Sequence, residues 1–211
     1  MRLPGFIFIK VADEFKDKTT AINQLWQTDF TYLEVIGWGW MYLSTILDDY
    51  SRYIIAWKLC TTIKTSNVPD TLDLALQASG CVRPMLSTTE TVLSDNGSCY
   101  VSGELAEWLG DKKMGHVRGP YHPQTQGKIE RWHQTLKNRI LLENYFFPAD
   151  LEIQIEAFVD HYNHHRYHGS INNLTPADVY FGRGQAILKQ RERIKLKTKE
   201  ARRLQCRKCA A

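Results

Sequence analysis

The sequence predicts an α/β fold with a mixed five-stranded sheet and flanking helices. The first observation is a set of three closely spaced runs between residues 26 and 59, rich in Tyr, Ile and Trp and separated by turn residues. The second is that two later predicted strands, the β-branched and apolar run 91–94 and the short segment 116–118, alternate with helical patterns. At 211 residues and 43% hydrophobic composition, the chain can bury one sizeable core.

The first three strands are predicted at Trp26–Val35, Met41–Leu47 and Tyr53–Leu59, and their short connections make them antiparallel neighbours. Residues 37–39 supply the glycines of the first hairpin turn. The second connection contains the acid pair Asp48-Asp49. A metal site is one interpretation of this pair, but we favour an Asp-initiated turn, because Asp side chains hydrogen-bond to nearby backbone groups.

Helices and strands alternate in the next part of the chain. Glycine is preferred just beyond a helix end, so two glycines mark predicted helix ends here. The predicted elements are, in order, a helix at Val68–Ser79 closed by Gly80, a strand at Thr91–Ser94 that stops at Asp95-Asn96-Gly97, a helix at Glu104–Leu109 ended by Gly110, and a strand at His116–Arg118.

A helix that contains Glu130 completes the predicted fold. Its buried stripe is indicated by apolar residues at steps of three, four and four, namely Ile129, Trp132, Leu136 and Ile140. Glu130 lies in a second, mostly polar row and is expected to face outward. The preceding residues 119–127 contain two prolines and are predicted to form a loop with Thr125 as the helix N-cap. Later helices are predicted at Ala149–His165 and, with Thr175 as N-cap, from Pro176.

Three carboxylates are candidates for chemistry. Asp29 lies on a strand, on the face opposite Trp26 and Phe30. Asp95 follows a strand end, and Glu130 stands on the outward row of its helix. Two strand aspartates and a helix glutamate, brought together, supply the oxygen ligands that Mg²⁺ requires. Two such ions can clamp an in-line displacement at phosphorus.

Five segments between residues 26 and 182 carry motifs, in the order WQTDFTYL, LDDYSRYIIAW, LSDNGSCYVS, GPYHPQTQGKIERWHQTLKNRI and FVDHYNHHRYHGSINNLTPADVYFG. They resemble the catalytic core of DDE transposases and retroviral integrases, most closely bacterial insertion-sequence transposases. The resemblance implies a ribonuclease-H-like fold, in which Asp29, Asp95 and Glu130 form a triad that binds two Mg²⁺ or Mn²⁺ ions. One departure is the spacing, since 34 residues lie between Asp95 and Glu130 where the family usually has 35.

The loop and helix around the glutamate also contain residues suited to DNA. Tyr121 and Gln124 are expected to contact a DNA strand end, by stacking and by hydrogen bonding respectively. Packing beneath the loop is an equally open alternative for Tyr121. Lys128, Arg131 and Lys137 are expected to contact phosphate, because cations near a metal site help to position a polyanionic backbone. An ordinary solvated face is the alternative for these three.

Charge is distributed unevenly along the chain, which has a net charge of +4. Residues 183–211 hold eleven of the Lys and Arg against Glu192 and Glu200, a net +9, which leaves −5 for residues 1–182. We predict a linker at residues 1–24, an integrase-type catalytic core at residues 25–182 and a basic C-terminal tail. The tail is either a helix that folds against a partner or a flexible arm. Nucleic-acid affinity is expected from local patches and this tail.

Cysteine content and hydropathy bear on the location of the protein. Five irregularly spaced cysteines do not make a disulfide framework. No apolar run approaches the roughly 18 residues needed to span a bilayer. We expect a cytoplasmic, nucleoid-associated protein without membrane contact. Its expected partners are transposon ends, target DNA and further copies of the chain, as a homo-oligomer on DNA.

The predicted function is metal-dependent DNA cleavage and strand transfer, by a DDE-type polynucleotidyl transferase that acts in DNA integration and transposition. One alternative is a ribonuclease-H-type nuclease, because one fold can host different reactions. Another is a truncated, non-catalytic DNA-binding remnant that interferes with transposition. Residues 1–24 leave no room for the helix-turn-helix region that precedes the core in insertion-sequence transposases, which favours the remnant, whereas the complete acid triad favours the enzyme.

Overall fold

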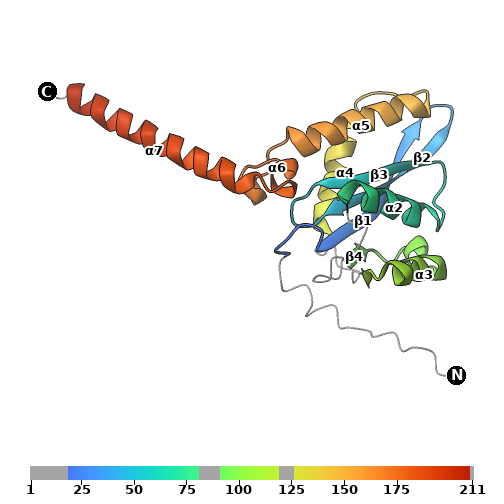
Figure 1. Cartoon of the computed structure of the whole chain (residues 1–211). Coiled ribbons are helices and arrows are strands. Elements are labelled where there is room, and N and C mark those ends of the chain that lie inside the picture. The colour runs from blue at the N-terminus through green and yellow to red at the C-terminus, as the bar shows by residue number, and fades with distance from the viewer. Residues whose placement is uncertain (1–18, 81–90, 119–125, 210–211) are drawn as a thin grey trace. The chain divides into compact units, whose positions relative to one another are not determined.

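A computed structural model describes residues 19–80, 91–118 and 126–209 of the chain (Figure 1). The chain divides into two compact units, residues 1–161 and residues 162–211. The first unit contains the sheet and all three predicted acids. The second contains the basic C-terminal segment.

The first unit is built on one sheet of five strands in the order β3-β2-β1-β4-β5. The first three strands are antiparallel neighbours, whereas β4 is parallel to β1 and β5 is parallel to β4. The predicted mixed five-stranded sheet is therefore confirmed. The strands are β1 (Leu25–Val35), β2 (Gly39–Asp48), β3 (Ile54–Cys60), β4 (Thr91–Ser94) and β5 (Gly115–Arg118).

Helices flank this sheet in the predicted order. Helix α2 packs against β2 and β3, and helix α4 packs against β1. The helices are α2 (Asn67–Ser79), a 3₁₀ turn η1 (Ser98–Tyr100), α3 (Gly103–Lys112), α4 (Gly127–Ile140) and α5 (Pro148–His164). The succession of three strands, helix, strand, helix, strand and helix confirms the element order predicted from the sequence.

Two helix ends test the predictions made from glycine. Gly80 follows α2 with φ 70°, the left-handed conformation that glycine adopts readily, so that prediction is confirmed. The prediction that Gly110 ends the next helix is wrong. Helix α3 continues to Lys112 and ends at Lys113, which takes the left-handed conformation itself with φ 56°. The Lys113 N–H then donates to the Gly110 carbonyl at 3.1 Å, so Gly110 lies inside the helix.

Burial changes along β1, the strand that carries Asp29. At its start Trp26, Gln27 and Thr28 are all buried, so both faces of the sheet are covered there. Towards its end Leu33 remains buried while Tyr32 is 56% exposed. Since Asp29 and Leu33 share a face, Asp29 lies on the side of the strand that the fold covers throughout.

The second unit is helical. It contains η2 (Gly169–Ile171), α6 (Pro176–Tyr180) and α7 (Gly184–Cys209). Thr175 caps α6 as predicted, because its hydroxyl oxygen accepts the Asp178 N–H at 3.2 Å. Within the part of the chain that the structure describes, no helix combines the length and the apolar composition needed to cross a membrane.

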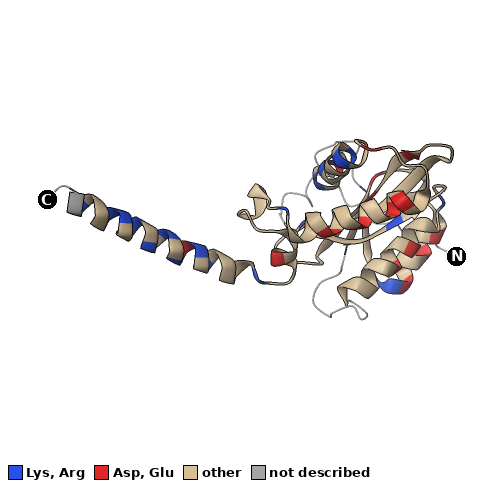
Figure 2. Ribbon diagram, turned by 90° about the horizontal axis from the view of Figure 1, so that it is seen from above, with Lys and Arg blue, Asp and Glu red and all other residues tan. Residues whose placement is uncertain are grey.

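Helix α7 carries most of the basic residues of the tail, and Figure 2 shows Lys and Arg repeated along it beyond its first turn. Near its start Arg191 donates from Nη1 to the Asn173 carbonyl at 2.8 Å and lies over the ring of Tyr167. Every residue from 192 to 207 is exposed. The tail is thus a solvent-exposed helix, and the predicted domain boundary between residues 182 and 183 lies within the second unit, just before this helix.

Candidate active site

Asp29 lies where the sheet opens between β1 and β4. The two strands pair only as far as Gln27 on β1 and Leu93 on β4. Beyond that point the Phe30 N–H donates to Asp29 Oδ1 at 2.8 Å. The Asp29 side chain is 22% exposed, so its carboxylate is oriented by the backbone and still reachable from solvent.

Asp95 directly follows β4 and comes to the same opening. The parallel register ends at the pair Gln27 and Leu93, and Asp29 and Asp95 each lie two residues beyond that pair. The Gly97 N–H donates to Asp95 Oδ1 at 2.8 Å. A Cβ atom at position 97 would lie 3.0 Å from that same oxygen, so glycine permits the close approach of backbone to carboxylate.

Electrostatics link Asp95 to Asp29 at this opening. Partial burial raises the pKa of Asp95, the negative charge of Asp29 raises it further, and the hydrogen bond from Gly97 opposes both effects. The buried phenol of Tyr100 has a pKa well above its ordinary value, first through burial and then through the charge of Asp29. A divalent cation bound here would stabilise the ionised form of Asp95, which the neighbouring charge of Asp29 disfavours.

Helix α4, which carries Glu130, packs against β1, the strand of Asp29. Its predicted apolar stripe is confirmed, since Ile129, Trp132, Leu136 and Ile140 are at most 2% exposed. Glu130 itself is exposed, as predicted. Among the described residues, no group of three or more His, Cys, Asp and Glu side chains lies close enough together to hold a metal ion. The convergence of Asp29, Asp95 and Glu130 on one metal centre therefore stays a prediction.

His133 is a site residue that the sequence did not reveal. It lies one turn after Glu130 on α4, and its Nδ1 atom is 3.5 Å from Asp29 Oδ2. The side chain is buried, and its Nε2 atom has no hydrogen-bond partner among the described residues. A polar residue directly beside Trp132 in the apolar stripe was the available signal. Through His133, the helix that carries Glu130 contacts the strand aspartate.

The donor set at this opening fits a hard divalent cation. Carboxylate oxygens are the ligands that Mg²⁺ and Mn²⁺ prefer, and Mg²⁺ sites usually combine one or two carboxylates with water and phosphate oxygens. Asp29 and Asp95 supply such oxygens at a place that solvent reaches. An exposed Glu130 on the adjacent helix is of the same donor type.

Two family models, both described as integrase core domain, match the chain over residues 19–123 and 115–176. Together they include the opening between β1 and β4 and the whole of α4. The chain belongs to the integrase core domain family. The resemblance inferred from the five motifs is thereby confirmed.

Relatives of this integrase core include bacterial transposases. It is 28% identical over 167 residues to the transposase for insertion sequence element IS904 of Lactococcus lactis, covering 76% of this chain and 62% of that protein. It is 28% identical over 160 residues to the IS629 transposase of Shigella sonnei, covering 74% and 51% respectively. The integrase core thus spans less than two thirds of the length of either transposase.

A solved structure confirms the ribonuclease-H-like fold of the integrase core. The HTLV-2 integrase catalytic core domain, determined in complex with magnesium in a trimeric form, matches with a TM-score of 0.61 at 18% sequence identity. The match covers 76% of this chain and 97% of that domain. At this identity the likeness concerns the fold, and the predicted fold class is confirmed.

The residues predicted to contact DNA occupy different environments in the integrase core. Tyr121 and Gln124 lie outside the described residues. Arg131 is exposed on α4. The ammonium of Lys137 lies 4.0 Å from the centre of the Tyr32 ring, a cation–π contact at the surface of β1. All four phosphate or strand-end contacts stay predictions.

Lys128 has a protein partner in the integrase core. Its Nζ atom donates to the carboxylate of Asp49 and, at 2.8 Å, to the Asp49 carbonyl oxygen. An ammonium that already serves two oxygens has fewer donors left for phosphate. Lys128 thus makes a contact within the fold, and its phosphate contact stays a prediction.

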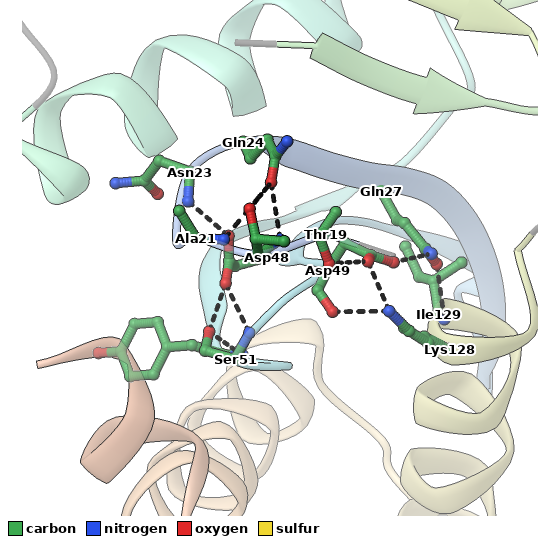
Figure 3. Close-up of polar contacts among 12 residues, drawn as sticks. Thr19, Ala21, Asn23, Gln24, Gln27, Asp48, Asp49, Ser51, Lys128 and Ile129 are labelled. Carbon is green, nitrogen blue, oxygen red and sulfur yellow. Dashed lines mark hydrogen bonds and ion pairs between the residues drawn. The ribbon is translucent and has the colours of Figure 1, made fainter. Parts of the chain in front are cut away.

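The neighbouring acid Asp48 confirms the turn interpretation of the Asp48-Asp49 pair. Its carboxylate accepts the Ser51 N–H at 2.8 Å and the Ser51 hydroxyl at 2.6 Å, and it also accepts the Asn23 N–H. Burial raises the pKa of Asp48, and the Ser51 bonds oppose that rise. Asp48 therefore stabilises the connection between β2 and β3, whereas Asp49 points elsewhere, towards β1 and α4 (Figure 3).

Proposed function

We propose that this chain is the catalytic core of a transposase that cuts DNA and joins DNA ends with the help of divalent metal ions. The observation that carries the proposal is the approach of Asp29 and Asp95 at the open end of the β1–β4 pair, beside the helix that carries Glu130. Membership of the integrase core domain family and the similarity to two insertion-sequence transposases support the same reaction.

In this proposal Asp29, Asp95 and Glu130 hold two Mg²⁺ or Mn²⁺ ions. The chemistry that such a bound pair supplies is activation of a water or of a DNA 3′-hydroxyl, together with stabilisation of the leaving oxygen. The protein backbone orients the carboxylate ligands. The Phe30 N–H orients the Asp29 carboxylate, and the Gly97 N–H orients that of Asp95. No protein nucleophile is required.

DNA is the proposed partner, as transposon end and as target. Arg131 and Lys137 lie on the helix that carries Glu130, and their positive charge suits the phosphates of a strand that reaches the acids. Tyr121 and Gln124, in the segment before that helix, are proposed to contact the strand end. We also propose that the chain acts on DNA as a homo-oligomer, since two DNA ends and a target must be joined in one reaction.

The reaction itself is the test. The full chain is incubated with a duplex that carries a free 3′-hydroxyl transposon end and with a supercoiled target, in Mg²⁺, in Mn²⁺ and in chelator. Joined products in either metal, absent with chelator, are expected. Cleavage of an RNA–DNA hybrid without any joining of DNA ends would instead assign a ribonuclease-H-type activity and overturn the proposal.

Helix α7 is proposed to bind the DNA backbone without reading base sequence. Its basic residues lie on a helix that is exposed from residue 192 to residue 207, so their charge is available to phosphates. Binding that neutralises phosphates releases counterions, and each phosphate contact adds about 0.9 to the slope of log affinity against log salt.

Deletion of residues 183–211 is expected to lower the affinity for every DNA duplex by a similar factor, about tenfold or more at low salt, and to flatten the salt slope by several units. The measurement is a binding titration of the full and truncated chains at several salt concentrations, with a transposon-end duplex and a scrambled duplex. Replacing Thr198 and Gln205 of α7 by Ala is the matched control, since it alters exposed residues without altering charge. A strong end preference that survives the deletion would refute this role for α7.

A further inference from the structure

A buried polar cluster around Asp49 joins three segments of the fold (Figure 3). Asp49 is 6% exposed and directly follows β2. Its Oδ1 atom accepts a hydrogen bond from Gln27 Nε2 at 2.7 Å. Its Oδ2 atom accepts from the Thr19 hydroxyl at 2.6 Å and from the Lys128 ammonium. Every strong contact of this carboxylate therefore reaches another part of the chain.

The Gln27 side chain uses both ends of its amide. While its nitrogen donates to Asp49, its Oε1 atom accepts the Ile129 N–H at 3.1 Å. The first N–H groups of a helix have no partner within the helix. Gln126, at the N-cap position of α4, makes no side-chain capping bond, and the predicted cap Thr125 lies outside the described residues. Gln27 thus supplies the cap of α4 from the neighbouring strand.

The cluster is adjacent to two of the three acids. Gln27 precedes Asp29 by two residues on β1, so the two side chains share a face of the strand. Lys128 precedes Glu130 by two residues on α4, which places them about 200° apart around the helix. Lys128 can therefore contact Asp49 while Glu130 faces solvent, and the structure shows both.

We propose that Gln27, Asp49 and Lys128 are positioning residues that set Glu130 at a fixed place relative to Asp29. The inference deepens the proposed function and rests on the metal site proposed there. Two hydrogen bonds from Lys128 to Asp49 and one from the Ile129 N–H to Gln27 fix the first turn of α4. They set both its position along the helix axis and its rotation about that axis. A slip by one residue moves a helix by about 1.5 Å and 100°, whereas a metal ligand must hold its place within about 0.5 Å and 10–20°.

Divalent-metal binding by the full chain tests the proposal without depending on activity. Free Mn²⁺ is measured by electron paramagnetic resonance, and stability is measured by urea unfolding without metal. Gln27→Leu and Lys128→Met are each expected to weaken Mn²⁺ binding by about 10- to 100-fold, the usual effect of losing a group that orients a metal ligand. Glu130→Gln is the reference for loss of a ligand itself.

Two further variants separate positioning from stability. Thr71→Val is the matched control, because the buried Thr71 hydroxyl donates to the Asn67 carbonyl on α2 and its loss should lower stability while leaving Mn²⁺ affinity unchanged. The double variant Asp49→Asn with Lys128→Met removes both charges of the pair, so stability should recover relative to Lys128→Met alone. Mn²⁺ binding should stay weak in the double variant, because the contacts that place α4 are still missing.

The Mn²⁺ affinities of these variants distinguish a positioning role of the cluster from a purely stabilising one. Normal Mn²⁺ affinity in Gln27→Leu and Lys128→Met, with weak binding in Glu130→Gln, would overturn the positioning role and leave the proposed function intact. Normal affinity in Glu130→Gln as well would overturn both. An equal loss of affinity in Thr71→Val, or recovery of affinity together with stability in the double variant, would show that the cluster acts only through stability and would also overturn the positioning role.

Discussion

Replacing Asp95 with Asn is expected to abolish metal-dependent cleavage and joining of DNA ends, by about 10³-fold or more. The change removes one negative charge from the proposed metal site, and bound metal ions supply several kcal/mol of transition-state stabilisation. Asn keeps the size of the side chain and an oxygen that can accept the Gly97 N–H, so the fold should be preserved. The measurement is a strand-transfer assay in Mg²⁺ and in Mn²⁺, with circular dichroism to check the fold.

Asp111→Asn is the control for this effect. Asp111 is exposed on α3 and lies outside the proposed site, so the same chemical change there should leave the rate unchanged. Strand transfer at the wild-type rate by Asp95→Asn would show that the assignment of this acid is wrong. A loss of activity in both variants would mean that the assay responds to net charge and not to the site.

Trp132→Ala is expected to destabilise the fold by about 3–5 kcal/mol, the usual cost of truncating a large buried side chain and leaving a cavity. Trp132 is 1% exposed, and its ring centre lies 5.6 Å from that of Phe158 on α5. Since whole domains are stable by only about 5–15 kcal/mol, much of the population should unfold on mild heating. The free energy of unfolding is read from urea titrations.

Gln134→Ala serves as the comparison on the same helix. Gln134 is exposed and bonds only to the nearby Asn138 among the contacts described for it, so its removal should change stability by no more than about 0.5 kcal/mol. An equally small effect of Trp132→Ala would mean that α4 does not pack on the core as described.

The sheet could be predicted because its signals are local. Aromatic and β-branched runs separated by short turns identify neighbouring antiparallel strands, and the register of β1 with β2 follows from a tight connection. The end of α3 could not be predicted from Gly110. Glycine is tolerated inside a helix, and the helix ended where Lys113 adopted the left-handed conformation, which is uncommon for lysine.

The candidate metal ligands can be predicted from the sequence, whereas the residues that position them cannot. Asp29 and Asp95 stand at a strand and at a strand end, within motifs that can be recognised. The Asp49 cluster depends on partners far apart in the chain, since Lys128 lies 79 positions from Asp49 and Ile129 lies 102 positions from Gln27. Periodicity describes only near neighbours, so it indicates neither the contact of Lys128 with Asp49 nor that of Gln27 with the Ile129 N–H.

The most direct test that Asp29, Asp95 and Glu130 share a metal centre is a crystal structure of the full chain grown with Mn²⁺, with the metal located by its anomalous scattering. We expect Mn²⁺ bound between Asp29 and Asp95, with Glu130 at the same centre and every pair of the three carboxylates within about 10 Å, as a shared two-metal centre requires. Mn²⁺ bound away from Asp29 and Asp95, or a Glu130 carboxylate more than about 10 Å from either aspartate in the metal-bound chain, would contradict it.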